Sequence, residues 1–124
     1  MKIRVYYEDT DAGGIVYHSN YINFCERARS EAFFMVGRMP VLEDGHFVAK
    51  KLEADYIASA RLGDLLEVKT SLIELKNASF TLLQEIFRDD EKLFSMKITL
   101  VFVGFDGKMG KIPPSEREFI KELK

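Results

Sequence analysis

A run of alternating residues near the carboxyl end constrains the fold of this chain more than any other feature. Apolar side chains occupy every second position from Phe94 to Phe102, and the positions between them begin with Ser95, Lys97 and Thr99. Because successive side chains of a strand point to opposite faces, this alternation predicts a strand with one apolar face. That face must be buried against other elements of the chain.

Four further segments predict strands. Alternating apolar and polar residues run from Lys2 to Glu8, where acids and glycines end the pattern. A less regular segment runs from His46 to Ala58, and a clearer one runs from Asp64 to Leu75. Another segment runs from Phe80 to Arg88. The pair Asp89-Asp90 predicts a hairpin turn between that segment and the last strand.

One long helix is predicted between the first strand and the others. Residues 9–20, DTDAGGIVYHSN, are dense in turn formers and predict an irregular loop, with Ser19 or Asn20 as the helix cap. Residues 21–36 place apolar side chains at helical spacing over a wide arc, and Gly37 follows as a stop signal. The width of this arc predicts a central helix that is covered over much of its circumference.

The order of these elements predicts the fold class. One strand, one helix and four strands joined by short turns give an antiparallel sheet with a long helix packed on it, an α+β arrangement. Residues Ser115 to Lys124 add a short charged helix or tail. A length of 124 residues allows one domain, so we expect residues 1–124 to form a single unit.

Composition narrows the class of partner and the compartment. The formal net charge of −2 argues against a general nucleic-acid binder. The single cysteine, Cys25, cannot form an internal disulfide, which suits the reducing cytoplasm. The amino terminus lacks the apolar region of a signal peptide, and no apolar run approaches the ~18 residues of a membrane span. We therefore expect a cytoplasmic protein without an integral membrane segment.

The residues best suited to catalysis lie in the loop before the helix. The carboxylates of Glu8, Asp9 and Asp11 precede a helix start, where unpaired backbone amides have positive character. A carboxylate facing such amides can perform acyl transfer. The amides stabilise the oxyanion, while the carboxylate attacks the carbonyl or activates a water. Helix capping and dipole pairing are the structural alternative, and spacing alone favours that alternative for any one of the three acids.

Other chemistries fit the same residues less well. The segment from Asp9 begins like a calcium loop, but its twelfth position is Asn20 rather than glutamate. His18 and His46 have no paired spacing for zinc, and Cys25 has no second cysteine, so no metal site is predicted. Cys25 falls on the apolar face of the helix, which favours packing over nucleophilic catalysis.

The loop and its flanks also resemble a known family. Residues 4–21, RVYYEDTDAGGIVYHSNY, and residues 24–29, FCERAR, closely resemble the YbgC branch of the 4-hydroxybenzoyl-CoA thioesterase family. The segments LEADY (52–56), ARLGD (60–64) and KIP (111–113) extend the likeness over nearly the whole chain. The resemblance implies a hotdog fold, in which an antiparallel five-stranded sheet wraps around one long central helix. It also implies an acyl-CoA thioesterase that releases a free acid and coenzyme A.

The resemblance implies roles for individual residues. Asp11 matches the family's catalytic carboxylate, acting as nucleophile or general base, and His18 matches a histidine whose neighbouring backbone amide faces the thioester oxygen. Tyr17 and Asn20 would shape the pocket. No metal or cofactor would be needed, because water is the second substrate. The coenzyme A phosphates would need local cations and polar turn residues, for which we expect Arg61, Asn77, Ser79, Lys108 and Lys111.

The expected assembly follows from the edge of the sheet. An open apolar edge is an aggregation risk, which pairing with a second copy removes. The resemblance to hotdog domains implies the same assembly, because these domains form homodimers, often arranged as homotetramers, with the active site at the subunit boundary. Two other functions stay open. One is a hotdog dehydratase that acts on hydroxyacyl thioesters, and the other is a non-catalytic module that binds acyl-CoA or acyl carrier protein.

Overall fold

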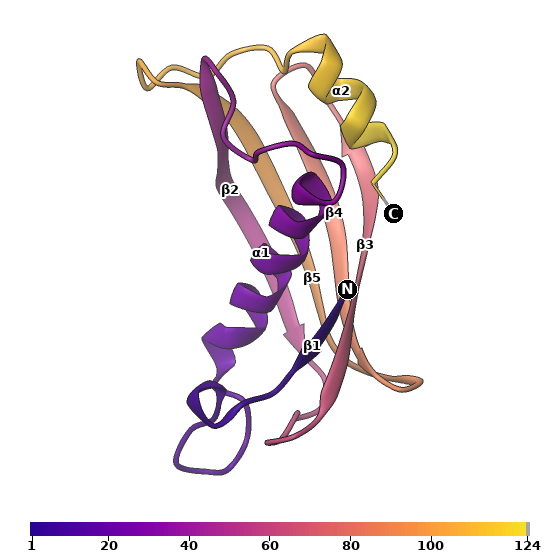
Figure 1. The fold of residues 1–124 in the computed structure, drawn as a ribbon. Helices are drawn as coiled ribbons and strands as arrows, with labels where there is room; N and C mark the ends of the chain where they lie inside the picture. The colour runs from indigo at the N-terminus through magenta and orange to yellow at the C-terminus, as the bar shows by residue number, and fades with distance from the viewer. Residues whose placement is uncertain (124) are drawn as a thin grey trace.

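A curved antiparallel sheet with a long helix across its concave face forms the body of the molecule (Figure 1). The computed structural model describes residues 1–123, so Lys124, the last residue of the predicted tail, lies outside them. The strands are β1 (Lys2–Arg4), β2 (Gly45–Tyr56), β3 (Leu65–Leu75), β4 (Ser79–Arg88) and β5 (Glu91–Gly104), and the helices are α1 (His18–Phe34) and α2 (Pro114–Lys121). The strand order β1-β3-β4-β5-β2 makes β1 and β2 the two edges.

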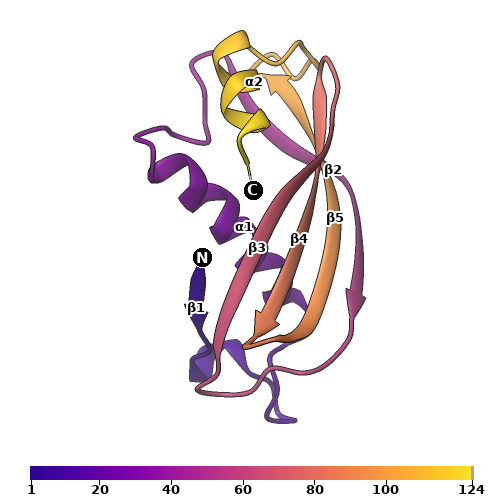
Figure 2. The same ribbon diagram turned by 90° about the vertical axis from the view of Figure 1, so that its right-hand side faces the viewer.

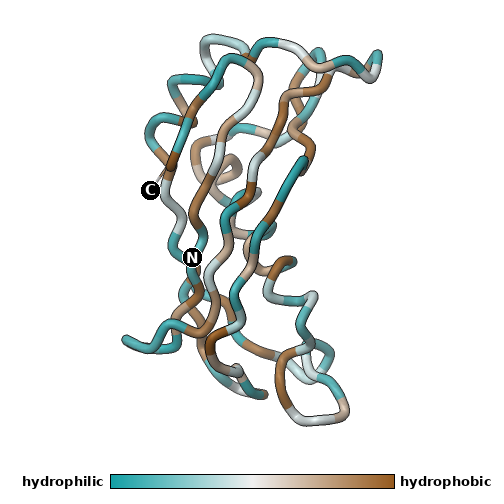
Figure 3. Tube along the Cα trace, turned by 180° about the vertical axis from the view of Figure 1, so that it is seen from behind, coloured by the Kyte–Doolittle hydropathy of each residue, from teal (hydrophilic) through white to brown (hydrophobic). Residues whose placement is uncertain are grey.

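The last strand confirms the strongest sequence prediction. Phe94 and Met96 are fully buried on β5, and Leu100 and Phe102 are each 6% exposed. Hydrophobic and hydrophilic residues are interspersed along the strands when the sheet is seen from behind (Figure 3). β5 is an inner strand, because it pairs with β4 on one side and β2 on the other. Tyr21 of α1 packs on Phe94, so the helix lies against the apolar face of β5.

The first predicted strand is shorter than its sequence pattern. The strand β1 ends at Arg4, and a single turn of 3-10 helix, Tyr7–Asp9, replaces the predicted extension to Glu8. The side chain of Asp9 explains the difference, because its Oδ2 accepts the backbone N–H of Tyr6 at 2.8 Å. The N–H of Asp9 also donates to the carbonyl of Tyr6 at 3.0 Å, so the chain turns before it can continue along β3.

The long helix begins one to two residues before its predicted caps. The helix α1 starts at His18, with Tyr17 at the N-cap position, so the expectation of Ser19 or Asn20 as cap was wrong. The side chain of Asn20 donates instead to the carbonyl of Asp9 at 3.0 Å. The stop at Gly37 was close, because α1 ends at Phe34 and Gly37 follows with a φ of 74°.

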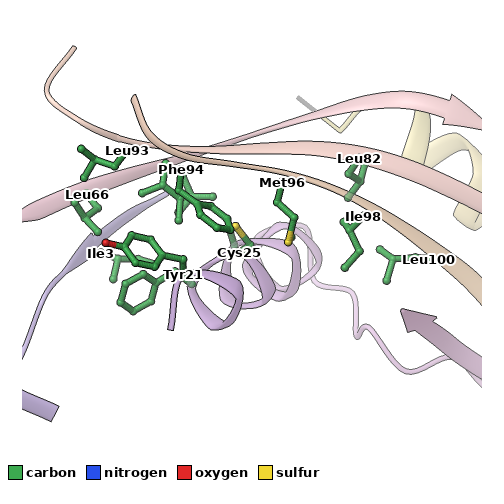
Figure 4. Close-up of a cluster of buried hydrophobic side chains, with 14 of the residues drawn as sticks. Ile3, Tyr21, Cys25, Leu66, Leu82, Leu93, Phe94, Met96, Ile98 and Leu100 are labelled. Atoms are coloured by element: carbon green, nitrogen blue, oxygen red, sulfur yellow. The ribbon is translucent and has the colours of Figure 1, made fainter. Parts of the chain in front are cut away.

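One face of α1 forms the core, and the rest of the helix is more open than predicted. Tyr21 stacks on Phe94 with ring centroids 5.2 Å apart, and Cys25 is fully buried beside the sheet (Figure 4). Burial raises the pKa of the Cys25 thiol to about 12, consistent with the predicted packing role. By contrast, Phe34 at the end of the helix and Val36 beyond it are about half exposed, at 48% and 59%. The broad apolar arc is therefore only partly covered within one copy.

The second helix lies on the same side of the sheet as α1 (Figure 2). The ring of Phe119 lies 4.7 Å from that of Phe33, and Arg38 forms an ion pair with Glu116 at 2.7 Å. These contacts hold α2 against the carboxyl end of α1. Neither helix of the described chain is long and apolar enough to cross a membrane.

Candidate active site

The loop between β1 and α1 is anchored by Asp9. This residue is 7% exposed, and its side chain accepts the N–H of Tyr6. Its backbone carbonyl accepts two more hydrogen bonds, from the N–H of Tyr17 at 2.9 Å and from the amide side chain of Asn20. With these three bonds Asp9 ties the start of α1 to the end of the loop, which is a structural role.

Asp11 differs from Asp9 in exposure and in bonding. It is exposed, and its Oδ1 accepts the N–H of Gly13 at 2.8 Å. Its backbone closes a tight turn by donating to the carbonyl of Ile15 at 2.9 Å and accepting from Gly14 at 3.0 Å. Gly14 has a φ of 79°, a conformation that other residues rarely adopt. One carboxylate oxygen is thus held in place, and Oδ2 accepts no hydrogen bond from residues 1–123.

Two clefts meet at the Asp11 side chain. One, of about 380 Å³, is lined by Asp11, Tyr21, Tyr56 and Ile57 among others, and it includes His18. The other, of about 550 Å³, is lined by Asp11 together with a second group of loop residues: Tyr7, Thr10, Ala12, Gly14 and Leu62. Asp11 is the residue that the two clefts share, so a molecule that fills both must cross this carboxylate.

The start of α1 supplies hydrogen-bond donors to the same region. The N–H groups of Tyr17 and Asn20 donate to carbonyls, whereas those of His18 and Ser19 donate to no acceptor within residues 1–123. Unpaired amides at a helix start carry partial positive charge. The site therefore combines a free carboxylate oxygen with a pair of unpaired backbone donors, an arrangement suited to acyl transfer.

Tyr56 holds the beginning of the helix and was not assigned a role from the sequence. Its hydroxyl donates to the backbone carbonyl of His18 at 2.7 Å, and its ring stands edge-on to Tyr21 at 5.5 Å. Burial, with a smaller contribution from Tyr21, raises the pKa of Tyr56, so the hydroxyl keeps its proton at neutral pH. The segment LEADY pointed to this residue, but its contact with a helix 38 residues earlier is a tertiary feature.

Comparison with known proteins identifies the family of this chain. The family described as "Thioesterase superfamily" matches residues 13–95. The chain belongs to the thioesterase superfamily. An acyl-CoA thioesterase YbgC of Helicobacter pylori is 42% identical, over 99% of this chain and 97% of the relative. An acyl-CoA thioester hydrolase YbgC of Escherichia coli O157:H7 is 39% identical, over 80% of this chain and 76% of the relative.

The fold of this superfamily member agrees with solved structures. A probable thioesterase from Bartonella henselae superposes with a TM-score of 0.86 at 30% identity, covering 91% of this chain and 97% of that one. The predicted hotdog fold, with five antiparallel strands and one long helix, is confirmed. The predicted resemblance to YbgC-type thioesterases is also confirmed.

The predicted substrate-binding residues of this superfamily member are spread over both ends of the sheet. Arg61 lies at the Asp11 end, where it forms an isolated bridge with Ile15. Asn77 and Lys111 border a separate pocket of about 300 Å³. Asn77 lies in the turn between β3 and β4, which is at the opposite end of the sheet from the loop before α1 (Figure 1). Ser79 begins β4 and Lys108 follows β5, so both also lie far from the Asp11 loop. Within one copy the structure brings Asn77 and Lys111 to one pocket and leaves Arg61 at the other end of the sheet.

The two remaining predicted residues flank the clefts without lining them. Tyr17 is 46% exposed, and its ring lies 4.4 Å from that of His18. The side-chain amide of Asn20 donates to the carbonyl of Asp9, so this side chain supports the loop rather than binding a ligand. Among residues 1–123, no cluster of three or more histidine, cysteine or acidic side chains is placed to hold a metal ion.

Proposed function

We propose that this chain hydrolyses the thioester of an acyl-CoA to a free acid and coenzyme A. The observation that carries the proposal is the position of Asp11, whose carboxylate borders both clefts near the unpaired amides of His18 and Ser19. Relatives at 39–42% identity are named acyl-CoA thioesterases or thioester hydrolases, which supports the substrate class.

The chemistry follows from these groups. The backbone amides at the start of α1 donate to the thioester oxygen and stabilise the negative charge that develops on it. As nucleophile, Asp11 attacks the carbonyl carbon and expels coenzyme A thiolate, and water then cleaves the resulting anhydride. As general base, Asp11 removes a proton from the water that attacks the same carbon. Both routes consume one water and release one acid and one thiol.

The two clefts suit the two halves of the substrate. The cleft with Tyr21, Tyr56 and Ile57 has apolar and aromatic walls, and we assign the acyl group to it. The wider cleft contains Leu62, next to Arg61, and we assign coenzyme A to it. This arrangement places the scissile bond over Asp11.

A second copy of the chain is part of the proposal. The strand β2 is an edge with a mostly exposed face along its length, and pairing it with β2 of a second copy would continue the sheet. In an antiparallel pair the Gly45 end of one strand lies beside the Tyr56 end of the other. The residues predicted to bind phosphate at the far end, including Asn77 and Lys111, would then reach the same end of the joined sheet as the partner's Asp11.

The remaining expectations concern cofactor and location. We propose that hydrolysis needs no metal or cofactor, because the carboxylate and the helix amides supply the required charges, with water as co-substrate. Dialysis against EDTA should therefore leave the rate of thiol release unchanged. A cytoplasmic location is supported by the single, reduced and fully buried Cys25.

Replacement of the carboxylate tests the proposed function. Asp11→Asn should lower kcat for thiol release about 10²- to 10⁴-fold, while circular dichroism and the oligomeric state stay those of the wild type. Glu8→Gln is the matched control, because Glu8 is an exposed acid of the same segment that borders neither cleft. A panel of short, long and aryl acyl-CoAs and an acyl carrier protein thioester would identify the substrate. Unchanged turnover in Asp11→Asn would refute the assignment.

The same assay separates the two alternative functions. A dehydratase would convert a hydroxyacyl thioester to an enoyl thioester without releasing a thiol. A binding module would bind acyl-CoA in a calorimeter and also release no thiol. Either result with the wild-type protein would overturn the proposal.

A further inference from the structure

The chain between β2 and β3, residues 57–64, forms a wall of both candidate clefts. Ile57, Ala58 and Ser59 line the cleft of about 380 Å³, and Leu62 lines the cleft of about 550 Å³. This wall segment belongs to no helix or strand, so hydrogen bonds to neighbouring parts of the chain must hold its shape. It lies at the same end of the sheet as the loop before α1 and the turn between β4 and β5 (Figure 1).

The wall segment also supports the loop that carries Asp11. The N–H of Val16, at the end of that loop, donates to the carbonyl of Ala60 at 2.9 Å. Ala60 is fully buried, and its own N–H donates to the hydroxyl of Tyr21 at 3.0 Å. Because Val16 is bonded to the wall segment, a shift of that segment would displace the loop and the Asp11 carboxylate with it.

Arg88, the last residue of β4, holds the wall segment at two points. Its Nη1 donates to the carbonyl of Ser59 at 3.2 Å and to Oδ2 of Asp64 at 2.8 Å. The same oxygen of Asp64 accepts the N–H of Arg61 at 2.8 Å. The side chains of Arg88 and Asp64 are only 29% and 24% exposed, so water screens this ion pair less than it screens a surface pair. One guanidinium thus fixes both the middle and the end of the segment.

The guanidinium of Arg88 has a second anion that does not belong to the wall segment. Its Nη2 donates to Oε1 of Glu91 at 2.7 Å within the β4–β5 hairpin. Burial disfavours the charged form of Asp64, but the hydrogen bonds from Arg61 and Arg88 outweigh it and lower the pKa of Asp64. Asp64 is therefore charged at neutral pH. The Asp64 bond connects Arg88 to the clefts, whereas the Glu91 bond serves the hairpin alone.

We propose that Arg88 is a positioning residue for the Asp11 site and acts through the wall segment. Its bonds to Ser59 and Asp64 keep this wall, and through Ala60 the Asp11 loop, in one arrangement relative to the bound substrate. A displacement of about 1 Å far from the reacting atoms can lower a rate roughly 10²-fold, so the loss of these bonds should lower kcat. The effect on catalysis rests on the proposed function, whereas the effect on the loop does not.

Steady-state kinetics of thiol release tests the role in catalysis. Arg88→Met should lower kcat about tenfold with less than about a twofold change in KM, because the groups around the thioester are aligned less often. Arg88→Lys restores the charge but not the fork of donors, so it should recover kcat to within about threefold of the wild type. Glu91→Gln, which weakens only the hairpin ion pair, is the matched control and should keep the wild-type kcat.

A double-mutant cycle tests whether Arg88 acts through Asp64. Asp64→Asn should also lower kcat about tenfold, and the double variant Arg88→Met/Asp64→Asn should be no slower than the slower single variant. Effects that multiply to about 100-fold would show two independent roles and overturn the proposal. A loss of kcat in Glu91→Gln equal to that in Arg88→Met would overturn it as well.

Hydrogen exchange follows the loop without any substrate. The amide of Val16 should exchange about tenfold faster in Arg88→Met than in the wild type or in Glu91→Gln, and this increase should exceed that of the Ile98 amide in the centre of β5. An increase at Val16 no larger than that at Ile98 would overturn the proposal. If Arg88→Met does not fold, Arg88→Lys and Asp64→Asn are compared with the wild type by the same criteria. Because exchange needs no activity, a wild type that releases no thiol would refute the proposed hydrolysis alone.

Discussion

The two halves of α1 present unused polar groups in opposite ways. At its start, Asp11 and the amides of His18 and Ser19 face open clefts, and few contacts depend on them. In its second half, Arg29 donates to the buried Gln84 of β4, and Gln84 donates in turn to the backbone carbonyl of Cys25 and to the hydroxyl of Thr70 on β3. The comparison teaches that the first region is available for chemistry at little structural cost, whereas the second contributes to stability.

Removal of Gln84 should give the largest difference in stability between the two regions. Gln84→Ala removes the hydrogen bonds that the buried amide makes to the carbonyl of Cys25, the hydroxyl of Thr70 and the guanidinium of Arg29, and it leaves a cavity. We expect a loss of about 3 kcal/mol in the free energy of unfolding, measured by urea denaturation. Asp11→Asn, at the exposed site, should change this free energy by less than about 0.5 kcal/mol. Equal effects of the two substitutions would contradict the comparison.

The free energy of unfolding should also depend on pH through the buried face of α1, and not through its exposed start. Burial raises the pKa of Cys25 from 9.0 to about 12, so the folded state keeps the thiol proton where the unfolded state releases it. The stabilisation is complete below pH 9 and is lost as the pH rises from 9 towards 12, by about 1.4 kcal/mol per pH unit. Urea denaturation of the wild type and Cys25→Ala at pH 8 and pH 10 isolates this slope. The same change in the free energy of unfolding between pH 8 and pH 10 in both proteins would refute this role of Cys25.

These two regions also show how far the sequence can be interpreted. The strict alternation of β5 predicted its buried face because side-chain direction in a strand depends only on local geometry. The candidate catalytic loop could be proposed from the sequence because Asp11 and the helix start are close along the chain. The early end of β1 was missed, because the bonds of Asp9 to Tyr6 outweigh the strand pattern. The hydrogen bond between Arg29 and Gln84 was missed as well, because the two residues are 55 positions apart in the sequence.

Tyr56 connects the exposed site to the sheet, and its hydroxyl should affect catalysis more than stability. In Tyr56→Phe the carbonyl of His18 loses its 2.7 Å hydrogen bond and can accept one from water instead. We expect kcat to fall about fivefold through a less fixed helix start, with KM nearly unchanged, because one such bond is worth about 1 kcal/mol. Steady-state kinetics distinguishes this from a binding role. A raised KM at constant kcat would show that Tyr56 contacts the substrate rather than positioning the helix amides.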